Sequence, residues 1–169
     1  MVEHRSFKAR VPRSIRGRLT IPVLMYKPYE IIEHTADVGL KANGATLKEL
    51  FENAAKGMFD IIEGKKVHKR ISAQVHKKIE IRKEVDDFEE LLVDWLSELL
   101  YIFNKESILF NDFRISRLDN KNLVSESSGK RIRLANAALQ TEIKAVTFHG
   151  LKIEKDSSGI FSCNIIFDV

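Results

Sequence analysis

The chain has 169 residues, of which 44% are hydrophobic and 31% are charged, so it is long enough for one compact domain with a sizeable hydrophobic core. It contains no run of about eighteen apolar residues, which excludes a membrane-spanning helix and predicts a soluble protein. The single cysteine, Cys163, excludes an intramolecular disulfide and is expected to be a small core residue, as in a protein of a reducing compartment such as the cytoplasm.

Positive charge is concentrated at the N-terminus. Residues 1–28 carry seven Lys or Arg and one Glu, which leaves 21 basic and 23 acidic residues for residues 29–169. The first segment also holds all three prolines and has no sustained periodicity, so we expect a basic extension outside the core. Three interpretations remain open: a disordered, solvated arm, an arm that touches nucleic acid, or translation that begins at Met25. Because residues 29–169 are slightly acidic, we expect direct RNA binding by this domain to be weak or absent.

A strand and a helix are predicted first in the domain. Residues 29–41 alternate loosely around a polar interruption, His34-Thr35-Ala36-Asp37, and Asn43-Gly44 is typical of a turn. Thr46 with Glu49 forms a capping-box pattern that begins a helix, and Gly64 ends it. The apolar residues of this helix recur at helical spacing: Leu47, Leu50, Phe51, Ala54, Ala55, Met58, Phe59 and Ile62.

A second strand and a second helix follow. Residues 71–81 alternate apolar and polar side chains, as expected for a strand with one buried face. A helix begins after Asp86-Asp87, and its apolar stripe consists of Phe88, Leu91, Leu92, Trp95, Leu96, Leu99 and Phe103.

The last third of the chain reads as strands. We predict a strand over residues 108–115, a polar loop at 119–122, a weak strand over 123–125 and no clear element over 127–140. Residues 141–155 and 160–169 alternate on both sides of Asp156-Ser157-Ser158-Gly159, which predicts a C-terminal β-hairpin. The expected fold is therefore a single α+β domain, with two amphipathic helices packed on antiparallel sheet.

The predicted hairpin places acidic groups together at the chain end. If Lys155 pairs with Ile160, then Asp168 lies opposite Thr147, within one residue, and Lys144 lies roughly 10 Å further along. The Asp168 side chain and the terminal carboxylate of Val169 then offer the oxygen ligands that a hard divalent cation prefers.

Several stretches together resemble the archease family. They are EHTADVGL from Glu33, NGATLKELFENAAKGMFDII from Asn43, FEELLVDWLSELLYIF from Phe88, EIKAVTFHGLKI from Glu142 and the terminal IIFDV. Each motif alone is weak, but they occur in the order and spacing of the family and cover nearly all of residues 29–169.

The resemblance implies a protein cofactor of the RtcB-type RNA ligase, which joins tRNA halves with GTP and manganese. Archeases promote guanylylation of the ligase and its multiple turnover and are not themselves ligases, so no enzymatic activity is expected. The family's divalent metal, taken to be calcium, carries over to Asp37, Asp168 and Val169, and its required lysine to Lys144. Some members are described as chaperones of a tRNA cytosine methyltransferase, which is a second class of partner.

Supporting roles are assigned to His34, Thr35 and His149, and simpler interpretations remain open. Asp37 could cap a turn, His34 could be an orienting or buried hydrogen-bonded residue, and Lys144 could be an ordinary exposed strand lysine. The segment from Ser127 to Gln140 departs from the family, which usually has a Gly-Glu element and a His there, so the contacts of this loop are open.

A second functional class is a metal-dependent phosphoryl-transfer or hydrolytic enzyme built on Asp37, Asp168 and His34. The sequence has no phosphate-binding G-x-x-x-x-G-K-[ST] loop, no nucleophile elbow and no Cys or His pair at zinc spacing. The missing catalytic groups favour a cofactor protein over an enzyme.

Overall fold

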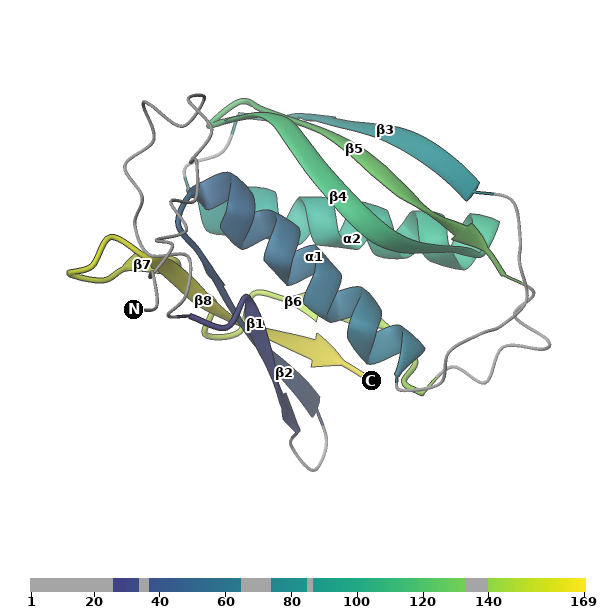
Figure 1. Ribbon diagram of the computed structural model, residues 1–169, viewed down its shortest axis with the longest axis horizontal. Helices are drawn as coiled ribbons and strands as arrows, with labels where there is room; N and C mark the ends of the chain where they lie inside the picture. Colours follow the sequence, from purple (N-terminus) through teal and green to yellow (C-terminus); the bar gives the residue numbers. More distant parts are fainter. Residues whose placement is uncertain (1–25, 34–36, 65–73, 85–86, 133–139) are drawn as a thin grey trace, which may run out of the picture.

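Two helices lie between two antiparallel sheets in the computed structural model, which describes residues 26–33, 37–64, 74–84, 87–132 and 140–169 (Figure 1). The helices are α1 (Leu47–Glu63) and α2 (Phe88–Glu106). The five-stranded sheet has the order β1-β2-β8-β6, with β7 also paired to β8; its strands are β1 (Tyr29–Glu33), β2 (Asp37–Gly44), β6 (Ala145–Thr147), β7 (Glu154–Lys155) and β8 (Phe161–Asp168). The three-stranded sheet has the order β3-β5-β4 and consists of β3 (Gln74–Arg82), β4 (Ile108–Asp119) and β5 (Asn122–Arg131). The predicted α+β class is confirmed, with the strands divided between two sheets.

Helix α1 begins and ends where its sequence signals predict. Thr46 Oγ1 accepts a hydrogen bond from the Glu49 amide at 3.1 Å, and Glu49 Oε2 accepts one from the Ala45 amide at 3.0 Å. At the other end Gly64 adopts a φ of 67°, and its amide donates to the Asp60 carbonyl at 2.9 Å. This positive φ is accessible to glycine at little cost, so the helix ends there.

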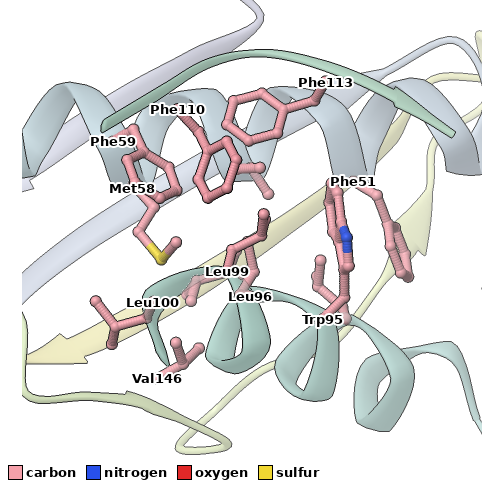
Figure 2. Close-up of a cluster of buried hydrophobic side chains, with 14 of the residues drawn as sticks. Phe51, Met58, Phe59, Trp95, Leu96, Leu99, Leu100, Phe110, Phe113 and Val146 are labelled. Atoms are coloured by element: carbon pink, nitrogen blue, oxygen red, sulfur yellow. The ribbon is translucent and has the colours of Figure 1, made fainter. Parts of the chain in front are cut away.

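The core fills the space between the two sheets and around both helices (Figure 2). Aromatic rings from three elements meet there: Phe59 lies edge-on to Phe103 and Phe110 at centroid distances of 6.0 and 5.5 Å. Phe51 stacks on Trp95 at 6.1 Å. Because both helices are covered on two sides, each buries a wide apolar face, which agrees with the apolar spacing predicted for each helix.

The strands differ more from prediction than the helices do. Strand β4 extends four residues beyond the predicted end at Ile115. Strand β5 has ten residues, whereas the sequence predicted a weak strand over residues 123–125 and no element from Ser127 onward. The predicted strand over residues 141–155 is wrong as a continuous strand, because β6 and β7 are separated by a turn at Phe148–Leu151 in which Gly150 has a φ of 65°.

Residues 26–28, which the sequence prediction places in the basic extension, contact the domain. Tyr26 Oη donates to Glu49 Oε1 at 2.8 Å and accepts from the Ala45 amide at 3.1 Å, at the start of α1. Asn43 donates its backbone amide to the Pro28 carbonyl and its side-chain amide to the Lys27 carbonyl, both at 2.8 Å. The rest of the extension, residues 1–25, lies outside the described residues.

Candidate functional site

Two predicted site residues become direct neighbours where strands β2 and β8 pair. Asp37 is the first residue of β2, Asp168 is the last residue of β8, and the two are register partners in the antiparallel ladder. Both side chains are exposed. Ala145 of β6 continues the same row on the other side of Asp168. We call this row the acidic row, after the carboxylates of Asp37 and Asp168.

Strand alternation turns the acidic row away from the core. The next row along these strands, Val38, Phe167 and Val146, faces the helices, and Phe167 is fully buried. Because successive side chains of a strand point to opposite faces, the acidic row lies on the outward face of the five-stranded sheet. A charged pair at this position is available to a ligand or a partner.

The chain end is fixed beside the acidic row by Lys144. The Lys144 amide donates to the Asp168 carbonyl at 2.8 Å, and Lys144 Nζ donates to the backbone oxygen of Val169 at 3.1 Å. The Val169 side chain packs against the hydrophobic core. Backbone pairing, a side-chain hydrogen bond and apolar packing thus hold the last two residues in place.

The register predicted from the sequence gave too large a separation between Asp168 and Lys144. It predicted Asp168 opposite Thr147 within one residue and Lys144 roughly 10 Å beyond; the partner of Asp168 is Ala145, two positions away, so this prediction was wrong. Lys155 pairs with Phe161 in place of Ile160. The turn after β6 adds residues between these two pairings, and counting along regular strands does not detect them. As a result, Lys144 lies beside Val169 and contacts it directly.

The oxygen atoms present fit a hard divalent cation. Asp37 and Asp168 supply carboxylates directly opposite each other, which is an unfavourable arrangement of like charges unless a cation compensates it. The backbone oxygen of Val169 is a third oxygen of the type that calcium binds. Among the described residues no cluster of three or more His, Cys, Asp or Glu side chains has the geometry of a metal site, so a cation here would take further ligands from backbone oxygens or water.

Of the three supporting residues, only His149 belongs to the part of the chain that the structure describes. His149 is exposed in the turn after β6, four positions beyond Ala145 and outside the strand pairing that forms the acidic row. His34 and Thr35 lie outside the described residues. Cys163 is buried, and burial raises the pKa of its thiol to about 12, so it is a core residue, as predicted, and a poor nucleophile.

Two exposed apolar side chains, one in the five-stranded sheet and one in the turn after β6, were not singled out from the sequence. Ile32 lies in β1 opposite Gly39, on the outward face of the same sheet, and is 37% exposed. Phe148, directly after β6, is 53% exposed. The signal for Ile32 was present in the sequence: Ile31 and Ile32 are consecutive, and a strand turns one of two consecutive side chains outward.

Comparison with known proteins gives a consistent result. The family model of the Archease protein family matches residues 29–169. Protein archease of Methanosarcina barkeri is 38% identical over 147 residues, covering 85% of this chain and 97% of that protein. Protein archease of Pyrococcus furiosus is 33% identical over 147 residues, covering 85% of this chain and 99% of that protein.

Solved structures agree with the sequence relatives. The solution structure of Methanobacterium thermoautotrophicum protein 1598 superposes with a TM-score of 0.67 at 34% identity, covering 84% of this chain and 99% of the other. The crystal structure of a Thermotoga maritima archease, described as a possible chaperone, superposes with a TM-score of 0.57 at 26% identity and covers 86% of this chain and 98% of the other. Within the described residues, no helix is long and apolar enough to cross a bilayer.

Proposed function

The chain belongs to the archease family, and from this premise we propose that it is a protein cofactor that activates an RtcB-type RNA ligase in tRNA splicing. In this role it promotes guanylylation of the ligase and its multiple turnover without catalysing a reaction itself. The observation that carries the proposal is the outward-facing pair of Asp37 and Asp168, with Lys144 bound to Val169 beside it. These four residues are the ones that the family resemblance assigns to function.

The proposed metal site uses three groups of this chain. Asp37, Asp168 and the Val169 oxygen would hold a divalent cation, since every donor is an oxygen of the kind that hard cations bind. The family resemblance makes calcium the expected ion. When bound, the cation supplies positive charge that neutralises the two opposed carboxylates. Fixing the strand ends in this way gives the outward face one defined shape for a partner to recognise.

A role as a partner-binding protein also agrees with the surroundings of the acidic row. Ile32 exposes apolar surface on the same outward face as the charged groups, two register positions along from Asp37. An apolar area beside a few fixed charges is typical of a protein interface. The Thermotoga maritima relative is described as a possible chaperone, and a chaperone likewise acts through contact with another protein. We therefore propose that the partner ligase contacts this end of the five-stranded sheet.

The decisive experiment measures guanylylation of a cognate ligase with labelled GTP, with and without this protein. We expect a substoichiometric amount of the wild type to accelerate guanylylation over many turnovers, and Asp37→Asn, Asp168→Asn or Lys144→Met to abolish the acceleration. A matched control is Lys41→Met, which removes a lysine from the outward face of the same sheet, four positions along β2 from Asp37.

Two results would contradict the proposal. One is that the cognate ligase is guanylylated at the same rate with and without this protein. The other is metal-dependent hydrolysis of nucleotide by the purified protein that Asp37→Asn abolishes, since this result would favour the phosphoryl-transfer enzyme over a cofactor.

A further inference from the structure

Lys144 donates to the same oxygen that the proposed metal site requires. Its Nζ lies 3.1 Å from the Val169 oxygen, and its own amide is fixed by a 2.8 Å hydrogen bond to the Asp168 carbonyl. The Lys144 side chain is exposed, so its ammonium group can leave this oxygen for water without disturbing the core. The backbone of Lys144 is therefore tethered to the site, while its charged end is free to move.

A divalent cation and an ammonium group on one oxygen repel each other. A calcium ion lies about 2.4 Å from its oxygen ligands, so with Nζ at hydrogen-bond distance the two positive centres would be about 5 Å apart. At that separation even water leaves a repulsion that corresponds to roughly a tenfold change in the binding constant. The two cations therefore oppose each other's binding.

We propose that Lys144 is a built-in competitor for the metal: cation binding displaces its ammonium group from Val169, and the released ammonium then pairs with an anionic group of the partner. This inference rests on the metal site of the proposed function and adds to it a coupling between the metal and Lys144. One consequence is that the lysine presents its charge to a partner only when the metal is bound. The coupling is reciprocal, because an anionic partner that holds the ammonium tightens metal binding.

Calorimetric titration of calcium into the full chain tests the competition. We expect Lys144→Met to bind calcium about tenfold more tightly than the wild type, because the competing charge is gone, and Lys144→Arg to bind like the wild type. Lys41→Met is the matched control: it makes the same change of net charge about 13 Å along β2 from Asp37, and its affinity should change less than twofold. Asp37→Asn should abolish binding.

A second measurement follows the lysine itself in the wild-type chain. The rate of acetylation of Lys144 by an amine-reactive ester, quantified by mass spectrometry relative to Lys41, should rise several-fold with saturating calcium. The rise should be absent in Asp37→Asn. This readout needs no substitution at Lys144, so it tests the competition even if Lys144→Met fails to fold.

The outcomes separate this inference from the proposed function. Calcium binding that is unchanged or weaker in Lys144→Met, or an acetylation rate that does not respond to calcium, overturns the competition while leaving the metal site intact. No calcium binding by the wild type at millimolar concentration overturns the metal site and the competition together. Stimulation of the ligase by the wild type under those conditions would show that the cofactor role stands without the metal.

Discussion

At the scale of single residues, the contacts of the central strand β5 explain why several of its side chains are small. Ser125 Oγ accepts a hydrogen bond from Trp95 Nε1 at 3.0 Å, and both residues are fully buried. A Cβ atom on Gly129 would collide with the Leu109 carbonyl of the neighbouring strand. Both positions therefore need a small side chain, although serine and glycine have low strand propensity.

Ser127 provides a prediction in the same strand. Its hydroxyl is buried and has no hydrogen-bond partner among the described residues, and a buried hydroxyl without a partner costs free energy. We expect Ser127→Ala to leave the free energy of unfolding unchanged or raise it by up to about 1 kcal/mol, measured by urea denaturation. Ser125→Ala, which removes the acceptor of the Trp95 hydrogen bond, should lower it by about 1 kcal/mol. An equal loss in both variants would contradict the prediction.

At the scale of secondary structure, the helices were predictable because their signals are local. The cap at Thr46, the stop at Gly64 and the apolar spacing of α1 all lie within one segment of sequence. Strand β5 was missed from Ser127 onward because its residues are set by neighbouring elements, as Gly129 is by the Leu109 carbonyl of β4. A strand that is specified by its neighbours has no signal of its own in the sequence.

Glu52 of α1 provides a pH-dependent prediction at this scale. Its Oε1 accepts a hydrogen bond from the Ile115 amide at 2.6 Å, next to an irregularity in the pairing of β4 with β5. Burial raises the pKa of Glu52 above its usual value of 4.5, and the hydrogen bond from Ile115 only partly opposes this. Between the unfolded and the folded pKa the native state therefore binds more protons than the unfolded state, so this group lowers stability as pH rises through that window.

The substitution Glu52→Gln keeps the acceptor for Ile115 and removes the titration. Relative to the wild type, we expect Glu52→Gln to gain stability as the pH rises from below 4.5 to neutrality, with the gain complete once the wild-type carboxyl is ionised. Urea denaturation at several pH values gives the difference between the two proteins. A difference that does not change with pH would show that Glu52 has the same pKa in the folded and unfolded states.

At the scale of the whole molecule, the candidate site depends on segments far apart in sequence. The assignment of Asp37, Asp168 and Lys144 came from resemblance to the family, and hairpin counting correctly brought the end of β8 beside the strand that contains Thr147. The predicted register of the hairpin was wrong because Thr147 and Glu154 are seven positions apart in sequence. Their partners in β8, Ile166 and Ser162, are only four positions apart. Such an excess lies in a turn, and sequence alternation alone does not reveal it.

The junction between the basic extension and the domain can be located by truncation. Deleting residues 1–24 should leave the melting temperature unchanged, because the high charge, the prolines and the lack of periodicity of this segment predict an arm outside the core. Deleting residues 1–28 removes the Tyr26 hydrogen bonds to Glu49 and Ala45 and the backbone acceptors of Asn43. We expect this second deletion to cost about 1–3 kcal/mol, measured by thermal and urea denaturation. Equal melting temperatures for the two truncated chains would place the boundary after residue 28.

The metal site makes a prediction about the stability of the whole fold. Asp37 and Asp168 are held opposite each other only in the folded chain, so a cation that they bind stabilises the native state by mass action. At a free calcium concentration 100 times the dissociation constant the gain is about 2.7 kcal/mol. For a chain of this length that gain corresponds to a rise in melting temperature of roughly 5–10 °C. Calorimetric melts with calcium and with a chelator, at matched ionic strength, measure this shift.

Neutralising one member of the acidic row separates metal binding from simple charge repulsion. In chelator, Asp37→Asn should melt slightly above the wild type, because the two carboxylates no longer oppose each other across the β2–β8 ladder. In calcium the order should reverse, since the variant has lost a ligand and the wild type gains the full binding energy. Asp168→Asn should behave in the same way. If Asp37→Asn keeps the calcium-induced rise, Asp37 is not a ligand, and the site of the proposed function is wrong in its first residue.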